Sequence, residues 1–169
     1  MDEVLSARRI FVLAVVLVVA AMAWALYLQY GAGLLPCPLC VIQRMAYIAA
    51  AIFALLAALV ARGTLARPLL GLLAIISAVA GGGVAAWHAW LLAYPPESLS
   101  CGRPFEWFSD DFPLVTWLPK LFRGDGDCLA VDWKFLGLAV PHLSLLAFLA
   151  LTALLVWATT TSLRDRARR

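Results

Sequence analysis

The stretch Leu35–Ala61, LPCPLCVIQRMAYIAAAIFALLAALVA, begins with two cysteines among prolines and continues as an almost unbroken apolar run. A helix rises about 1.5 Å per residue, so about 20 apolar residues cross a hydrocarbon layer of roughly 30 Å. Val41–Ala61 is long enough for this crossing. We therefore expect it to form a membrane-spanning helix with Cys37 and Cys40 at one end.

The whole chain shares this character, because 64% of its 169 residues are hydrophobic and 14% are charged, with a mean hydropathy of +0.93. Soluble domains have roughly 45–50% apolar and about 25% charged residues. Three further apolar runs cover 10–28, 68–92 and 140–163. Backbone in lipid must satisfy its own hydrogen bonds, and no run alternates as barrel strands do. The sequence predicts an all-α membrane protein, a four-transmembrane-helix bundle that forms a single integral membrane domain over 1–169.

The first run has a second interpretation. Arg8 and Arg9 followed by apolar residues and Ala23-Trp24-Ala25 resemble a signal peptide with its small-residue cleavage site. The run at 10–28 is longer than the roughly 7–15 residues of a signal-peptide core. We therefore favour a retained helix, with cleavage as the alternative.

The basic residues predict the orientation of the bundle, since loops rich in Lys and Arg stay in the cytoplasm. They gather before the first run, between the second and third, and after the fourth, at Arg8, Arg9, Arg62, Arg67, Arg164, Arg166, Arg168 and Arg169. The loop at about 29–40 has no charge, and the loop at about 94–139 has more acidic than basic residues. We expect both termini in the cytoplasm and these two loops, with all four cysteines, on the outer side.

Cys37, Cys40, Cys101 and Cys128 therefore face a compartment where disulfides persist, and they allow three pairings. Spacing makes Cys37–Cys40 with Cys101–Cys128 the simplest of these. A Cys101–Cys128 bond would close a long loop and contribute roughly 3–4 kcal/mol in the chain-entropy model. A Cys37–Cys40 bond would organise almost nothing. Reactivity is the better explanation for that pair.

Local geometry supports a reactive pair. Proline suits the first position of a helix, so Pro38 places Cys40 in the first turn, where free N–H groups and the helix dipole favour an anion. Arg44 is four residues further and shares that face. These features stabilise a thiolate. We predict a stabilised thiolate at Cys40, at membrane depth, with Cys37 more exposed ahead of it.

Two other interpretations of the cysteines remain. A four-cysteine zinc site normally shows two close pairs, whereas Cys101 and Cys128 are far apart, so we expect no metal. A purely structural role is the second alternative, and it fits Cys101–Cys128 better than Cys37–Cys40.

Cys37-Pro38-Leu39-Cys40 followed by Arg44, at the start of the second of four runs, resembles the disulfide bond formation protein B (DsbB) family of inner-membrane thiol–quinone oxidoreductases. This family helps to keep the bacterial periplasm oxidising. The likeness covers nearly the whole chain in order and spacing. It continues through Tyr94-Pro95, Cys101, Trp117-Leu118-Pro119, Gly126-Asp127-Cys128, Trp133–Leu138 and Pro141.

The resemblance implies a relay in the bacterial inner membrane. A DsbA-type thioredoxin-like partner of the periplasm attacks Cys101–Cys128 and forms a mixed disulfide through Cys101. Freed Cys128 then attacks Cys37, and Cys40 leaves as a thiolate beside a ubiquinone or menaquinone. The quinone takes two electrons and is reoxidised by the respiratory chain. Catalysis is assigned to the four cysteines, and quinone binding to Cys40, Arg44 and His88.

Several features of the resemblance leave alternatives open. His88 could instead be an interfacial histidine bonded to water or backbone. The aromatic segment 104–122 implies a short horizontal helix at the periplasmic membrane surface, or else a plain loop packed on the bundle. Gln43 stands where relatives can carry an acidic residue. Gly81-Gly82-Gly83 predicts close helix approach.

The expected activity is therefore that of a quinone-dependent thiol–disulfide oxidoreductase that sustains disulfide formation, with no nucleic-acid partner. An ordinary structural disulfide, below about −300 mV, could oxidise DsbA at about −120 mV only uphill by about 8 kcal/mol, so an electron acceptor is needed. The alternatives are a disulfide-stapled scaffold without turnover, and a reductant that runs the relay in reverse.

Overall fold

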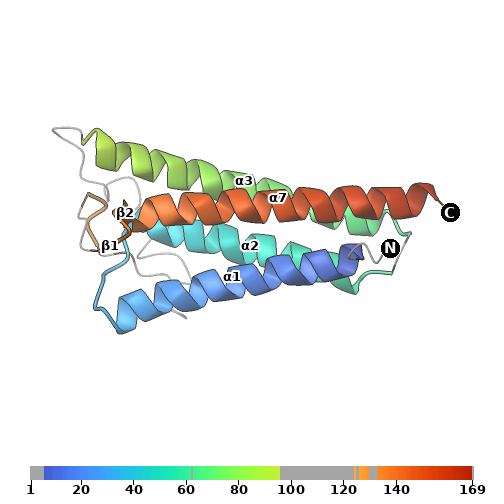
Figure 1. The fold of residues 1–169 in the computed structure, drawn as a ribbon, viewed down its shortest axis with the longest axis horizontal. Coiled ribbons are helices and arrows are strands. Elements are labelled where there is room, and N and C mark those ends of the chain that lie inside the picture. Colours follow the sequence, from blue (N-terminus) through green and yellow to red (C-terminus); the bar gives the residue numbers. More distant parts are fainter. Residues whose placement is uncertain (1–5, 62, 96–123, 125, 130–132, 169) are drawn as a thin grey trace, which may run out of the picture.

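A computed structural model of the chain describes residues 6–61, 63–95, 124, 126–129 and 133–168. Its helices are α1 (Ala7–Tyr30), α2 (Pro38–Leu59), α3 (Ala66–Ala93) and α7 (Val140–Ala167) (Figure 1). All four are long and apolar enough to cross a membrane. The prediction of an all-α, four-helix membrane protein is confirmed, and the protein is a multi-pass membrane protein.

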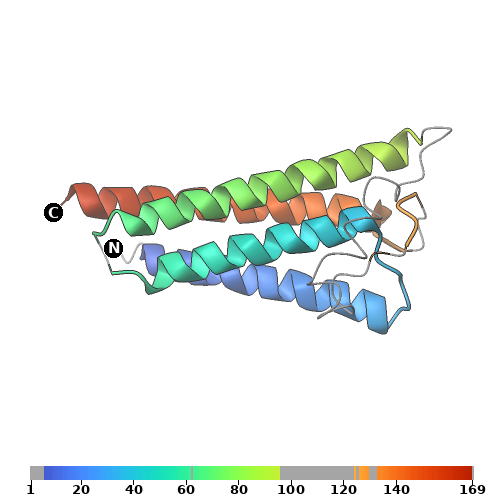
Figure 2. The same cartoon turned by 180° about the vertical axis from the view of Figure 1, so that it is seen from behind.

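The helices form one bundle in which α3 packs against α2 and α7, and α1 packs against the same two helices (Figures 1 and 2). Both chain termini lie at one end of the bundle, together with the connection between α2 and α3. The segment 31–37 and the start of α7 lie at the opposite end. We call these the terminal end and the cysteine end.

Arg67, at the start of α3, closes the end of α2. Its side chain is buried and donates from Nε to the Ala57 carbonyl at 3.1 Å and from Nη2 to the Val60 carbonyl. The last carbonyls of a helix lack intrahelical partners and carry partial negative charge, so a guanidinium satisfies and stabilises them. The short connection between α2 and α3 is thereby fixed.

The core of the bundle combines large side chains with small ones. Phe11, Phe148, Leu151 and Leu155 are fully buried against alanines. At Gly81 a Cβ atom would collide with the Phe148 ring and come within 2.7 Å of Ala46, so only glycine allows α2, α3 and α7 to approach there. A Cβ at Gly83 would meet nothing within 4 Å. The predicted close approach is therefore right at Gly81 and wrong at Gly83.

A two-stranded hairpin precedes α7, and the all-α prediction did not include it. Strands β1 (Lys134–Phe135) and β2 (Leu138–Ala139) are antiparallel, with Lys134 opposite Ala139. Leu136 and Gly137 join them with φ angles of 51° and 82°. Two consecutive residues with positive φ make the tight turn that matches strand twist, and glycine lowers its cost. Cys101 and the segment 104–122 lie outside the described residues.

Candidate active site

Cys37 and Cys40 meet at the start of α2. Cys37 is the N-cap residue, Pro38 takes the first helical position as predicted, and the Cys40 N–H donates to Cys37 Sγ at 3.3 Å. Both cysteines are free thiols, with their sulfurs 2.8 Å apart. The hydrogen bond to Cys40, followed by burial, raises the pKa of the Cys37 thiol. Cys37 therefore stays protonated and donates a hydrogen bond to the Cys40 sulfur.

Cys37 was expected to be the more exposed of the two, and this prediction is wrong. Its side chain is 3% exposed, whereas Cys40 is half-buried. A stretch of the connection between α3 and α7 covers Cys37, because the Gly126 N–H donates to the Pro36 carbonyl at 3.0 Å. A Cβ at residue 126 would collide with the Leu35 carbonyl, so glycine permits this close contact.

Cys128 packs beside Cys37 from this covering stretch. It is buried and disulfide-bonded, and its predicted partner Cys101 lies outside the described residues. One ligand atom each from Cys37, His88 and Cys128 lie within 4.8 Å of one another. These three could ligate a soft metal ion only after reduction of Cys128, because a thiolate is the ligand and a disulfide sulfur is not. The same proximity suits thiol–disulfide exchange between Cys37 and Cys128.

His88 of α3 connects the cysteines to α2. Its Nε2 lies 3.0 Å from the Cys128 carbonyl and 3.9 Å from Cys37 Sγ, and its Nδ1 lies 3.4 Å from Gln43 Nε2. A carbonyl only accepts, so Nε2 carries the hydrogen and Nδ1 accepts from the Gln43 amide. His88 is buried and lines the cavity described below. The backbone bond of the alternative interpretation is therefore present, and the ring also lies at the cavity.

Arg44 is held by a residue that sequence reasoning missed. Arg44 lies one turn after Cys40, is 7% exposed, and donates from Nη1 to Gln29 Oε1 at 2.8 Å. Gln29 is near the end of α1, just beyond the predicted apolar run. A polar residue at that border was the only signal, and it could not reveal the partner on another helix.

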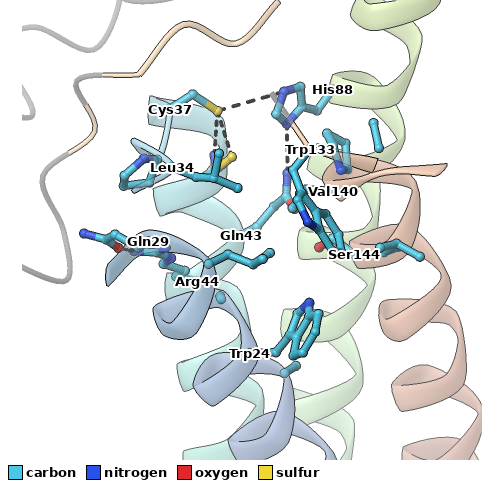
Figure 3. A pocket seen from close by; sticks show the side chains of 18 of the residues that line it. Trp24, Gln29, Leu34, Cys37, Gln43, Arg44, His88, Trp133, Val140 and Ser144 are labelled. Carbon is cyan, nitrogen blue, oxygen red and sulfur yellow. Dashed lines mark hydrogen bonds between the residues drawn. The ribbon is translucent and has the colours of Figure 1, made fainter. Parts of the chain in front are cut away.

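A cavity of about 320 Å³ opens at the cysteine end, between α1, α2 and α7 (Figure 3). It exists because α1 diverges from the bundle there, and beyond Val18 only Leu28 of α1 is buried. The cavity lies near the lower limit of roughly 300–1,000 Å³ for ligand pockets. Its polar lining is concentrated near the cysteines, at Cys37, Cys40, Gln43, Arg44, His88, Gln29 and Asp127.

Most of the remaining cavity wall is apolar or aromatic. Trp24 of α1 and Trp133 of the hairpin meet edge to face, with ring centroids 6.0 Å apart. Tyr47 of α2 and Ser144 of α7 also line the cavity, and Ser144 lies across it from Arg44 (Figure 3). Tyr47 is three residues beyond Arg44 on the same helix face, so spacing could have identified it. Ser144 depends on how α7 packs against α2, which spacing does not reveal.

The chain is similar to known proteins along most of its length. The family model described as disulfide bond formation protein DsbB matches residues 7–158. The disulfide bond formation protein B of Azoarcus sp. is 46% identical over 82% of this chain and 83% of its own length. Those of Nitrosomonas europaea and Aromatoleum aromaticum are 44% and 39% identical, over 89% and 95% of this chain and 93% and 95% of their own lengths. The chain therefore belongs to the disulfide bond formation protein B family.

Proposed function

We propose that this protein oxidises the dithiol of a periplasmic thioredoxin-like protein of the DsbA type and transfers the two electrons to a membrane quinone. One observation carries the proposal. Cys37 contacts the Cys40 thiol and lies within 4.8 Å of Cys128, while Cys40 lines a cavity between membrane-spanning helices. A sulfur that contacts one sulfur and lies close to a second can pass a disulfide from one to the other.

The cavity fits a quinone headgroup. It is mainly apolar and aromatic, and Arg44, Cys40 and His88 bring polar groups to one end. These three residues would hold the ring, and small side chains such as Ala21 and Ala147 on the apolar side leave room for a prenyl tail. When bound, the quinone supplies an acceptor for two electrons and two protons and leaves as the quinol.

The disulfide exchange steps balance without any other reagent. A partner thiolate attacks Cys101–Cys128 and forms a mixed disulfide with Cys101, and the Cys128 thiolate leaves. Cys128 then attacks Cys37 of a Cys37–Cys40 disulfide and releases Cys40. The second partner thiol attacks the mixed disulfide, so oxidised partner departs and the Cys101 thiolate is freed.

Cys101 next attacks the Cys37–Cys128 bond, which restores Cys101–Cys128 and leaves Cys37 and Cys40 reduced. The state with Cys128 in a disulfide and two free thiols at Cys37 and Cys40 is consistent with this point in the cycle. The two electrons and two protons of the Cys37–Cys40 dithiol are those that the quinone accepts.

The residues around Cys40 favour negative charge on its sulfur. The raised pKa of Cys37 keeps the shared proton on Cys37. The first-turn N–H groups of α2 and the cation of Arg44 lie on the same face as Cys40, in a site of low dielectric. Gln29 fixes Arg44 through its side-chain oxygen. Cys40 is thus the sulfur prepared to give up electrons.

The proposed orientation follows from charge. The terminal end carries the arginines in the first turn of α1 and the last turn of α7, including Arg8, Arg9, Arg164 and Arg166. Basic residues remain in the cytoplasm, so the cysteine end faces the periplasm of a bacterial inner membrane. There the four cysteines meet the soluble partner, and the respiratory chain reoxidises the quinol within the bilayer.

Quinone reduction by the purified protein tests the proposal. With reduced DsbA-type partner and a short-tail quinone, wild type should reduce the quinone, and Cys37→Ser and Cys40→Ser should each abolish it. Arg9→Gln, at an exposed position of α1, is the control and should retain activity. Thiol mapping confirms that the Cys128 disulfide persists in both variants. Undiminished activity in both variants would instead support a stapled scaffold without turnover.

The direction of flow needs a second measurement. Oxidised partner is incubated with quinol and the protein, and partner thiols are counted. DsbA is a strong oxidant, so the forward reaction needs a quinone of still higher potential. Reduction of the partner by the quinol is then uphill, and we expect thiols to form slowly compared with the forward rate. Preferential flow from quinol to partner would show a disulfide reductant.

A further inference from the structure

His88 makes a hydrogen bond that the proposed relay does not use. It lies near the end of α3, is 3% exposed, and places Nε2 3.0 Å from the Cys128 carbonyl. The same nitrogen lies 3.9 Å from Cys37 Sγ, and Nδ1 lies 3.4 Å from the Gln43 amide (Figure 3). The Nε2–H donates to the Cys128 carbonyl, because a carbonyl only accepts. One buried side chain thus contacts both cysteines between which a disulfide would pass.

The stretch that carries Cys128 is also held from the side of α2. The Gly126 N–H donates to the Pro36 carbonyl at 3.0 Å, one residue before Cys37. Cys128 is 1% exposed, belongs to a buried cluster with Cys37 and Leu91, and has its sulfur within 4.8 Å of Cys37 Sγ. Two hydrogen bonds from different parts of the bundle therefore fix where this stretch lies.

The bond from His88 does not depend on the chemistry at the sulfur. Disulfide exchange changes the Cys128 side chain, whereas His88 binds the main-chain carbonyl of that residue. When a partner thiolate frees Cys128 from its disulfide, the stretch loses a covalent tether but can keep this hydrogen bond. A nucleophile that is already held near its target reacts faster, because little motion remains to be restricted on the way to the transition state.

We propose that His88 is a positioning residue for disulfide exchange, and that its bond to the Cys128 carbonyl keeps the freed Cys128 thiolate beside Cys37. In this step the Cys128 sulfur bonds to the Cys37 sulfur, the Cys37–Cys40 bond breaks, and Cys40 leaves as a thiolate. One disulfide replaces another, so no further oxidant is needed. The inference rests on the proposed function and gives His88 a role in the relay besides its place at the cavity wall.

A single-turnover trap tests the inference without quinone reduction. Fully oxidised protein is mixed with a DsbA-type partner that keeps only its attacking cysteine, and no quinone is added. The mixed disulfide with Cys101 forms, and freed Cys128 either attacks Cys37 or returns to Cys101. Samples are quenched with an excess of a fast alkylating reagent. Mass mapping then measures Cys128 as a labelled thiol and as the Cys37–Cys128 disulfide over time.

Three variants of His88 separate its hydrogen bond from its bulk. His88→Leu removes the donor, and His88→Asn keeps an amide that is too short to reach the carbonyl. Each should slow formation of the Cys37–Cys128 disulfide by about 3- to 10-fold, as loss of one hydrogen bond predicts. His88→Gln extends its amide nitrogen about as far as Nε2 and should recover most of the rate. Trp87→Phe, at a 57% exposed position of α3, is the matched control.

The mixed disulfide with Cys101 should form at the wild-type rate in all of these variants, because the partner attacks before His88 acts. Labelled Cys128 should therefore accumulate in His88→Leu and His88→Asn. The unfolding temperature in detergent is measured alongside, so that only folded variants are compared. If His88→Leu does not fold, the comparison of His88→Asn with His88→Gln carries the test, since the two side chains differ by one methylene group.

The outcomes separate this inference from the proposed function. Wild-type exchange in folded His88→Asn, or an equal loss in His88→Asn and His88→Gln, would overturn the inference alone, provided that wild type exchanges and reduces quinone. Slower formation of the mixed disulfide itself would overturn it too, because His88 would then act on an earlier step. Wild type in which Cys128 never joins Cys37 would overturn the inference and the proposed relay together.

Discussion

The terminal half of the bundle and its cysteine end are built from similar apolar helices, but they pack differently. In α1, the buried residues Ala7, Ile10, Phe11, Ala14 and Val18 all precede the middle of the helix, and only Leu28 follows. The terminal half is closed by side chains such as Phe11 and Leu155, which are fully buried. At the cysteine end α1 diverges and leaves the cavity.

The contrast shows how a membrane protein can keep an opening without a large loss of stability. Lipid tails are as apolar as leucine, so no hydrophobic force draws two helices together within the bilayer. Close packing must therefore be built by shape, as Gly81 and Phe148 do. Where that shape is missing, lipid or a lipid-soluble ligand can fill the gap. The cavity at the cysteine end is such a gap, and its polar side chains can bind a polar group of a ligand.

The largest expected effect sharpens the contrast along a single helix, α7. Leu155→Ala removes a side chain with 0% exposure and should lower the free energy of unfolding by about 2–5 kcal/mol. Leu149→Ala is the matched control, since Leu149 is 59% exposed and faces outward. Leu143→Ala, on the cavity wall, should cost little because that site is already open. Thermal unfolding in detergent measures all three, and equal losses would remove the distinction between the two regions.

The next effect concerns the polar end of the cavity. Arg44→Gln should weaken quinone binding by roughly 10- to 100-fold, as loss of a charged hydrogen-bond donor predicts, with little change in unfolding temperature. Arg44→Lys should recover part of the loss, because it restores the charge but not the planar fork. Arg9→Gln is the control. A large fall in unfolding temperature for Arg44→Gln would make Arg44 a structural residue of the cysteine end.

Much of the fold could be predicted because each element has a local cause. Apolar length fixes the four helices, and Pro38 fixes where α2 begins. The burial of Cys37 could not be predicted, because it depends on a distant loop stretch that packs through Gly126.

The cysteine motif and Arg44 could be identified as candidate site residues because their spacing lies within one helix turn. Gln29 and Ser144 could not, since each reaches the site from another helix. The positive φ at Leu136 and Gly137, which makes the hairpin, was equally hidden, because a single glycine does not specify a two-residue turn. Contacts across helices were thus the part that sequence patterns left open.

A smaller effect tests the close helix approach near the middle of the bundle. Gly81→Ala places a Cβ against the Phe148 ring and should lower the free energy of unfolding by about 1–3 kcal/mol. Gly83→Ala is the control, because a Cβ there meets nothing within 4 Å and the change should be neutral or stabilising, by up to about 1 kcal/mol. Equal behaviour of the two variants in thermal unfolding would show that the glycines do not determine helix approach.

The smallest effect concerns the proton shared at the cysteine end. The raised pKa of Cys37 means that less of it is thiolate at pH 8 than for an ordinary cysteine, so alkylation of reduced protein should be slow there and speed up as the pH rises. Cys40→Ala removes the largest cause, so the pKa of Cys37 should fall and its alkylation at pH 8 should accelerate by up to about tenfold for each unit of pKa. Mass mapping of labelled Cys37 gives the rate, and the matched Leu39→Ala variant keeps the Cys40 hydrogen bond while loosening the cover. Acceleration in Leu39→Ala but not in Cys40→Ala would mean that burial, and not the bond between the two sulfurs, holds the proton on Cys37.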